Sequence, residues 1–472
     1  MVFSSTTFLI IFLPVTMVLY YLLGVTITKS TAVKNLILLI ASLIFYAWGE
    51  PVYIILMLIS ICFNFFVGKD MDQAKQMNRK KKVRTLFISA VIFNIGVLGF
   101  FKYSNFLIEN IANITGLGIR PLNLPLPVGI SFYTFQILSY IIDLYNGNIR
   151  AQRRFLSFAL YVSLFPQLIA GPIVKYKDIS DQLMYRKEDL SSFSKGLNRF
   201  VFGLSKKLIL ANTLGSVYSF VQDAGTDNIS MLTAWVGIIC YTLQIYFDFS
   251  GYSDMAIGLG GIFGFSFCEN FNYPYIAVSV TDFWRRWHMS LSSWFRDYVY
   301  IPLGGNRCKV PRVILNLLIV WMLTGFWHGA SWNFLLWGLF YGILLILEKY
   351  VLAGVINKIP KGLRWFITMI CVMVGWVLFS APSLGEALNY IGAMFGYAIS
   401  FVDSFGAFIL FTNLVLIIIA AICATPIYTA LSVRLGEKRF SKLMVVVTPV
   451  LFLLCVIFMI SETYNPFLYF RF

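Results

Sequence analysis

Charged side chains are scarce in this chain. Asp, Glu, Lys and Arg make up 12% of its 472 residues, about half the share that soluble globular domains usually carry. There are only two histidines, and the seven cysteines form neither a C-x-x-C pair nor a Cys/His cluster, so neither a disulfide framework nor a metal site is expected. Walker-type loops and G-x-S-x-G motifs are also missing, which leaves nucleotide-driven and hydrolase chemistry without a motif.

Long apolar runs are plentiful instead. Hydrophobic residues make up 59% of the chain, and runs long enough to cross a hydrocarbon core recur from end to end. We predict an all-α polytopic membrane protein, a single membrane domain over residues 1–472, with about twelve transmembrane helices and re-entrant or interfacial helices between them. The predicted spans cover residues 6–24, 35–49, 51–67, 86–108, 127–146, 200–222, 231–249, 313–329, 331–348, 364–381, 405–424 and 443–460.

The basic residues predict an orientation. If alternate connections starting with 25–34 face the cytoplasm, only Lys102, Arg120 and Arg471 of the 37 Lys and Arg fall on the other side. Lys206 and Lys207 are assigned to the cytoplasmic side in this scheme. Both termini are then extracytoplasmic, and the net charge of +16 is explained by membrane topology and lipid headgroups, with no nucleic-acid partner.

Two stretches do not fit simple spanning. Residues 155–173 are interrupted by Pro166, Gly171 and Pro172 and have basic segments on both sides. Residues 247–265 are rich in glycine and carry two aspartates. We predict that both dip into the membrane without crossing it, which requires protein or water around the loosened backbone. Such broken helices near one face favour a cavity there.

One histidine, His328, lies inside an apolar run, LTGFWHGASW (residues 323–332). A buried histidine can serve packing alone, as a neutral ring hydrogen-bonded to a neighbouring helix. The small and polar residues around it, and its place in a tight turn between two apolar runs, favour a catalytic base instead. Ionisable side chains at membrane depth are costly, and imidazole suits proton abstraction near neutral pH.

The other histidine, His288, lies in a stretch rich in tryptophan, tyrosine and arginine at residues 270–307. An interfacial helix with an aromatic belt explains this composition. Alternatively, the arginines hold the phosphates of a carrier such as coenzyme A. Forty residues separate the histidines, so helical spacing does not pair them. The candidate phosphate-binding residues are Arg285, Arg286, Arg296 and Arg307.

The chain ends in an aromatic motif at residues 463–472, within SETYNPFLYFRF. An interfacial anchor is a sufficient explanation for it. Tyr464 and Tyr469 nevertheless carry phenols on the side away from the basic loops, and a phenol can accept an acyl group and pass it on.

The central and C-terminal motifs resemble the bacterial membrane-bound O-acyltransferase (MBOAT) family, and within it the branch that acetylates alginate and related polysaccharides. The resemblance rests on YFDFSGYSDMAIGLGGIFGFSFCENFNYPYIAVSVTDFWRRWHMSLSSWFRDYVYIPLGGNR, LTGFWHGASWNFLLWGLFYG, YVSLFPQLIAGPI and PFLYFRF.

This resemblance implies a ring of tilted helices around a thin floor with a central tunnel. It implies His328 and His288 as catalytic residues, and Tyr469 as an acyl relay. The implied donor is acetyl-CoA, the final acceptor is an exported polysaccharide, and an extracytoplasmic esterase-like acetyltransferase is the partner, at a bacterial cytoplasmic (inner) membrane. D-alanyl transfer to teichoic acid and a transporter or flippase without chemistry are the alternatives.

Overall fold

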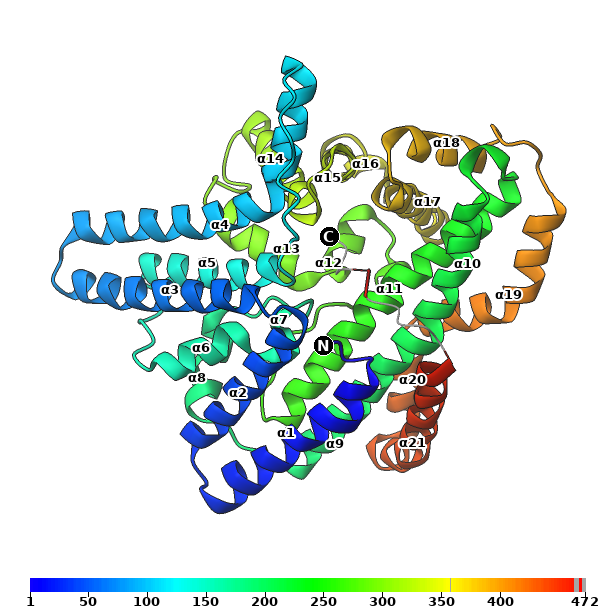
Figure 1. Cartoon of the computed structure of the whole chain (residues 1–472). Coiled ribbons are helices and arrows are strands. Elements are labelled where there is room, and N and C mark those ends of the chain that lie inside the picture. The colour runs from blue at the N-terminus through cyan, green and yellow to red at the C-terminus, as the bar shows by residue number, and fades with distance from the viewer. Residues whose placement is uncertain (357, 462–466, 469–472) are drawn as a thin grey trace. The chain divides into compact units, whose positions relative to one another are not determined.

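The computed structural model describes residues 1–356, 358–461 and 467–468, and every regular element within these ranges is a helix. The chain divides into two compact units. The first unit comprises Met1–Phe200 and Ser253–Cys268, and the second comprises Val201–Tyr252 and Glu269–Phe472. Figure 1 traces the helices from the blue N-terminal segments to the red C-terminal ones.

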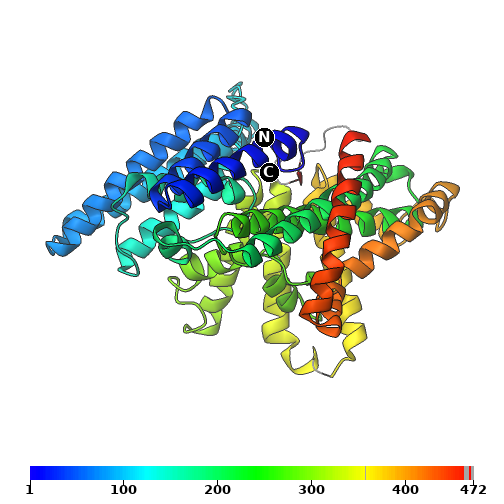
Figure 2. The same ribbon diagram turned by 90° about the horizontal axis from the view of Figure 1, so that it is seen from below.

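The first unit consists of long helices joined by short turns. Figures 1 and 2 show α3 and α4 running alongside each other, and α5 also packs against both. Three π-helical or α-helical segments follow one another without a break at the N-terminus, so residues 7–27 form one continuous rod. The helices of this unit are η1 (Thr7–Phe12), α1 (Leu13–Leu19), η2 (Tyr20–Ile27), α2 (Thr31–Gly49), α3 (Tyr53–Gln76), α4 (Lys80–Thr115), α5 (Ile130–Asn146), α6 (Phe155–Ser163), α7 (Phe165–Leu168), α8 (Tyr176–Met184) and most of α9 (Leu190–Ser205).

The second unit contains most of the residues expected to carry chemistry. Its α14 and α15 form a tight hairpin. The two helices approach so closely at Gly325 that any side chain there would overlap the backbone oxygen of Phe334. The helices of this unit are η3 (Lys206–Ala211), α10 (Asn212–Asp223), η4 (Thr226–Asn228), most of α11 (Met231–Ile262), η5 (Pro274–Ile276), α12 (Val280–Arg286), α13 (Met289–Phe295), η6 (Arg296–Tyr300), α14 (Val310–His328), α15 (Trp332–Ile346), η7 (Leu347–Val351), α16 (Ala353–Ile356), α17 (Lys361–Ser380), α18 (Leu384–Met394), α19 (Ser404–Cys423), α20 (Ile427–Leu435) and α21 (Glu437–Ser461).

Within the described residues, ten helices are long and apolar enough to cross a membrane. They match ten of the twelve predicted spans, which confirms the all-α polytopic class. The other two predicted spans are helical as well. Residues 127–146 fall largely on α5, which has 17 residues, and residues 200–222 fall on the consecutive α9, η3 and α10.

The break in the helix predicted at residues 247–265 is wrong. α11 runs from Met231 to Ile262 without interruption. Its glycines serve close packing here. A Cβ atom at Gly258 would lie 2.6 Å from the backbone oxygen of Gly196, so a larger residue would push the two helices apart. Small residues are the usual means of close helix contact in membrane proteins.

The interruption predicted within residues 155–173 is present. α6 ends at Ser163, Leu164 leaves the helical conformation with ψ of 110°, and the short α7 follows. All residues from Ser157 to Val174 are buried, so protein surrounds the broken backbone. A helix of nine residues extends roughly 14 Å, too little to cross a bilayer.

Candidate active site

His288 occupies the bend between α12 and α13. Its backbone has φ of 43°, the left-handed region, which costs an L-amino acid about 1–2 kcal/mol. α12 begins about two turns earlier, at a cap in which the Ser279 hydroxyl accepts a hydrogen bond from the Asp282 amide. His288 itself is only 1% exposed. Strained backbone of this kind is typical of functional sites.

Asn270 orients the His288 ring. The Asn270 Oδ1 atom accepts hydrogen bonds from the Ser290 amide at 3.2 Å and from the Ser290 hydroxyl at 2.8 Å. Since a backbone amide can only donate, this atom is the oxygen of the side-chain amide. His288 Nδ1 lies 3.0 Å from the same oxygen and must therefore carry a proton. The lone pair of the neutral ring is consequently on Nε2.

The burial of His288 also determines its charge. Burial lowers the pKa of His288 to about 3, because the charged ring would lose its hydration. The ring is neutral at physiological pH, and Nε2 is a hydrogen-bond acceptor. The Phe249 ring from α11 packs edge-on against the imidazole, with ring centroids 4.7 Å apart.

His328 has quite different neighbours. It is the last residue of α14, at the α14–α15 turn, and is 4% exposed. Aromatic rings surround it: the centroids of Trp327 and Trp337 lie 5.0 Å from that of His328, and the centroid of Phe379 lies 5.3 Å away. Aromatic side chains therefore form much of the surroundings of His328.

The fold brings the two histidines to one indole. The ring centroid of Trp327 lies 5.0 Å from that of His328 and 6.2 Å from that of His288. Sequence spacing alone did not relate these residues, because forty positions separate them. A single side chain now connects the two candidate catalytic rings.

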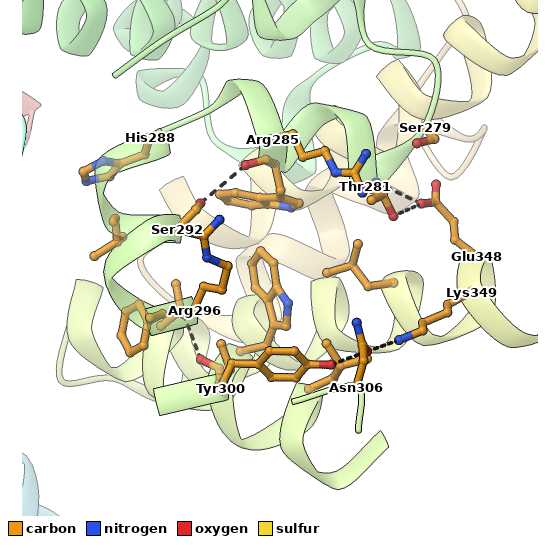
Figure 3. Close-up of a pocket in the computed structure, with 18 of the residues that line it drawn as sticks. Ser279, Thr281, Arg285, His288, Ser292, Arg296, Tyr300, Asn306, Glu348 and Lys349 are labelled. Atoms are coloured by element: carbon orange, nitrogen blue, oxygen red, sulfur yellow. Dashed lines mark hydrogen bonds between the residues drawn. The ribbon is translucent and has the colours of Figure 1, made fainter. Parts of the chain in front are cut away.

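A cavity of about 640 Å³ borders His288. This volume falls in the range of small-molecule and cofactor sites. Aromatic and aliphatic side chains, including Trp284 and Trp321, form much of its wall, and Arg285, Arg296 and Lys349 supply positive charge. Figure 3 shows His288 and Lys349 at opposite edges of the cavity, with the imidazole directed away from Arg285. The cavity therefore suits an elongated molecule with an anionic end and an apolar end.

Polar contacts hold the cavity wall in place. Glu348 accepts hydrogen bonds from the Val280 amide at 2.6 Å, the Thr281 amide at 2.9 Å and the Thr281 hydroxyl at 2.6 Å. The carboxylate thus caps the first turn of α12, where the helix dipole favours negative charge. The next residue, Lys349, donates to Asn306 Oδ1 at 2.5 Å.

The four candidate arginines separate into two groups. Arg285 and Arg296 line the cavity, whereas Arg286 and Arg307 are not among its lining residues. Arg286 instead forms an ion pair with Asp282 at 2.8 Å. Arg296 pairs with Asp297 at 2.8 Å and remains largely exposed. No residue in the described part of the chain forms a hydrogen bond or ion pair with Arg285.

Several contributors were missed in the sequence. Asn270 was part of the aromatic and basic stretch, yet nothing marked it as the partner of His288. Lys349 and Glu348 follow an apolar run, so they read as the end of a span. Tyr469, the proposed relay, lies outside the described residues. Where side chains are described, no three His, Cys, Asp or Glu residues come together as a metal site would require.

Comparisons with known proteins point to one family. The model of the MBOAT, membrane-bound O-acyltransferase family matches residues 148–386. A probable alginate O-acetylase of Pseudomonas aeruginosa is 43% identical over 404 residues, covering 84% of this chain and 75% of that protein. A peptidoglycan O-acetyltransferase of Helicobacter pylori is 38% identical over 426 residues, covering 84% of this chain and 80% of that protein.

A more distant relative carries a different acyl group in its name. A teichoic acid D-alanyltransferase of Bacillus subtilis is 29% identical over 257 residues, covering 52% of this chain and 63% of that protein. The family match includes both histidines, the bend that holds His288 and the α14–α15 hairpin. With ten candidate spans and these similarities, the chain is a multi-pass membrane protein of the membrane-bound O-acyltransferase family.

Proposed function

We propose that this acyltransferase takes an acetyl group from acetyl-CoA on the cytoplasmic side of the bacterial inner membrane and passes it toward hydroxyl groups of an exported polysaccharide. One observation carries the proposal: His288 borders a cationic cavity and shares the Trp327 indole with His328. The names of the alginate- and peptidoglycan-acetylating relatives support acetyl as the group and a polysaccharide as the acceptor.

The cavity supports a phosphate-bearing donor. The Arg285 guanidinium has no partner in the described part of the chain, so it is available for a phosphate, with Arg296 and Lys349 beside it. The apolar wall formed by residues such as Trp284 suits the acyl-carrying arm. The thioester then lies near His288. Arg286 and Arg307, which we first considered as donor ligands, are not needed in this arrangement.

The transfer step needs a base and an exit for the proton. The acceptor oxygen attacks the carbonyl carbon of the thioester, a C–O bond forms, and the C–S bond breaks. His328 removes the proton of the acceptor hydroxyl and returns it to the departing thiolate, so coenzyme A leaves as the thiol. A placed base typically contributes about 10² to 10⁴ in rate. His288, whose neutral Nε2 accepts hydrogen bonds, positions the thiol or the hydroxyl.

The acceptor in this first step is the phenol of Tyr469, which makes the C-terminal motif an acyl relay. An extracytoplasmic esterase-like acetyltransferase then moves the acetyl group from the phenol to a sugar hydroxyl, and the phenol regains its proton. The orientation with both termini extracytoplasmic belongs to the same proposal, because the relay must meet a partner outside.

Labelled acetyl-CoA tests the function directly. Purified protein in lipid nanodiscs should release free coenzyme A and become labelled on the chain. A transporter or flippase would do neither, and a D-alanyltransferase would not turn over acetyl-CoA. Tyr469→Phe removes only the phenolic oxygen and should abolish stable labelling. If polymer acetylation in cells continued at the parent rate with Tyr469→Phe, the relay would be excluded while the histidine chemistry would stand.

A further inference from the structure

A buried ion pair joins Lys207 of η3 to Asp248 of α11. Asp248 is next to Phe249, the residue of α11 that packs on His288, and the pair has no part in the transfer step described above. Lys207 Nζ and Asp248 Oδ1 form an ion pair at 2.5 Å, and both side chains are 3% exposed. Lys207 falls within the predicted span 200–222 near its cytoplasmic side, and its burial shows that it is an interior residue. Burying two charges costs desolvation energy, and such a pair is often no more stabilising than apolar residues of similar size. A role other than stability is therefore worth seeking.

Both members of the pair contact the C-terminal segment. The second carboxylate oxygen, Asp248 Oδ2, accepts a hydrogen bond from the Leu468 amide at 2.8 Å. Lys207 Nζ lies 4.6 Å from the centroid of the Phe467 ring, the geometry of a cation–π contact. The Phe467 ring is 1% exposed and meets Tyr252 edge-on at 4.8 Å. We call Lys207, Asp248, Tyr252, Phe467 and Leu468 the C-terminal clamp.

The clamp lies within one helical turn of Phe249, the residue of α11 that contacts His288. Asp248, Phe249 and Tyr252 are on the same stretch of α11, and residues three or four apart lie on one face of a helix. Phe249 packs on the His288 ring, while Asp248 and Tyr252 hold the C-terminal segment. One turn of α11 therefore ties the end of the chain to the candidate active site.

We infer that Lys207 and Asp248 are positioning residues, which hold the chain at Phe467 and Leu468 so that the C-terminal segment presents the acyl acceptor to the histidines. This inference rests on the proposed function, because it gives the C-terminal segment a part in transfer. The ion pair aims the carboxylate: with Oδ1 on the ammonium, Oδ2 is directed at the Leu468 amide. The hydrogen bond uses the backbone, so it fixes chain position whatever side chain residue 468 carries.

Two double variants separate positioning from stability. Lys207→Met with Asp248→Asn removes both charges but keeps an oxygen that can accept from the Leu468 amide. Lys207→Met with Asp248→Leu removes the charges and the acceptor. We expect similar thermal midpoints for the two. The Leu variant should lose roughly 10- to 100-fold in the rate of chain acetylation with an unchanged KM for acetyl-CoA, and the Asn variant should recover most of that rate.

A second pair of variants changes only the C-terminal segment. Leu468→Pro removes the amide hydrogen that is donated to Asp248. Leu468→Ala shortens the same side chain but keeps this amide hydrogen. Carboxypeptidase digestion followed by intact mass measurement reports whether residues 467–468 are held. These residues should be released faster from Leu468→Pro and from the Lys207→Met/Asp248→Leu variant than from the matched Leu468→Ala and Asp248→Asn proteins.

The outcomes distinguish the two proposals. A parent protein that neither releases coenzyme A nor becomes labelled means that the proposed function fails. An active parent, with Leu and Asn double variants equal in rate and in carboxypeptidase release, overturns the clamp alone. Equal losses of rate and of thermal midpoint in both double variants would show that the ion pair is a structural element, and this result would also overturn the clamp inference. If the Leu double variant does not fold, the Leu468→Pro and Leu468→Ala comparison decides.

Discussion

The bend around His288 and the hairpin around His328 surround the same type of side chain with different neighbours. His288 is fixed by a polar contact, from Nδ1 to Asn270 Oδ1 at 3.0 Å, and it borders a cavity that contains Arg285. His328 stands among Trp327, Trp337 and Phe379 at the end of α14, and it is not among the residues that line that cavity. The contact with Asn270 defines the tautomer of His288, and the aromatic rings around His328 define its position.

This difference suggests a division of labour. A neutral ring with a fixed acceptor nitrogen is suited to orienting a hydroxyl or thiol beside the donor. A ring packed among aromatic side chains is suited to taking a proton where water is excluded. Substitutions of the two histidines and of the residues around them test this assignment of roles.

Loss of the His328 imidazole should have the largest effect. His328→Ala is expected to reduce chain acetylation by roughly 10³-fold or more, because the proposed base is gone. The measurement is the initial rate of labelling from acetyl-CoA, with size-exclusion and thermal profiles to show that the protein is folded. Phe379→Leu disturbs the same aromatic packing and keeps the imidazole, so it should retain most of the rate. Comparable losses in both variants would assign His328 to packing.

Loss of the His288 imidazole should have a smaller but still large effect. Asparagine tolerates left-handed backbone, so His288→Asn leaves the bend unstrained. We expect the rate of acetylation to fall roughly 10²-fold, which is the lower end of what a placed acid–base group contributes. A rate within a factor of two of the parent would show that His288 has no part in transfer, so that only His328 would keep its assigned role.

Two adjacent arginines test whether the donor binds in the cavity beside His288. Arg285→Gln removes a guanidinium that lines the cavity, and Arg286→Gln removes one that pairs with Asp282 outside it. A charge-assisted contact at a partly exposed site should be worth roughly a 3- to 10-fold change in KM for acetyl-CoA. Steady-state kinetics should show that increase for Arg285→Gln and not for Arg286→Gln. The reverse pattern would move the donor site away from the cavity.

The smallest effect is a shift in pH profile. Since burial lowers the pKa of His288 to about 3, the ring is neutral throughout the physiological range, and its protonation should limit activity only in strong acid. Asn270→Asp places a carboxylate against Nδ1, which favours the protonated ring and raises this pKa. Protonation removes the acceptor nitrogen, so the acid limb of the rate profile should move to higher pH.

The control for that shift lies two residues away. Asn272 is exposed, and its backbone amide donates a hydrogen bond to the Arg286 carbonyl. Asn272→Asp therefore adds the same charge to the same loop, and its pH profile should match that of the parent. Equal shifts in both variants would point to a general charge effect rather than to the Asn270–His288 contact.

Much of the helical architecture followed from hydropathy, and the failures have identifiable causes. Ten predicted spans coincide with long apolar helices, because an apolar run of sufficient length has few alternatives. The glycines at 251–261 were taken as helix breakers, but in α11 they allow close helix contact. Composition cannot distinguish these two uses of glycine, because the difference depends on what packs against the helix.

The candidate site was predictable only in part. Scarcity singled out His288 and His328, and motif resemblance supported them. The tautomer of His288 could not be foreseen, because it depends on Asn270, eighteen residues earlier, and on a bend with positive φ. The partner of Lys207 could not be foreseen either, since Asp248 is 41 residues away and only the fold brings the two side chains together. Long-range pairing of polar groups was thus the main missing information.

The cap that Glu348 places on α12 has a consequence for donor affinity. Its carboxylate fixes the start of the helix that carries Arg285, and the adjacent Lys349 is tied to Asn306 on the facing loop. One short stretch of chain thus joins two walls of the cavity. A ligand entering there meets side chains that are already ordered, so less conformational entropy is lost when it binds. If the proposed thioester donor binds there, its tight capture depends on rigidity as much as on charge.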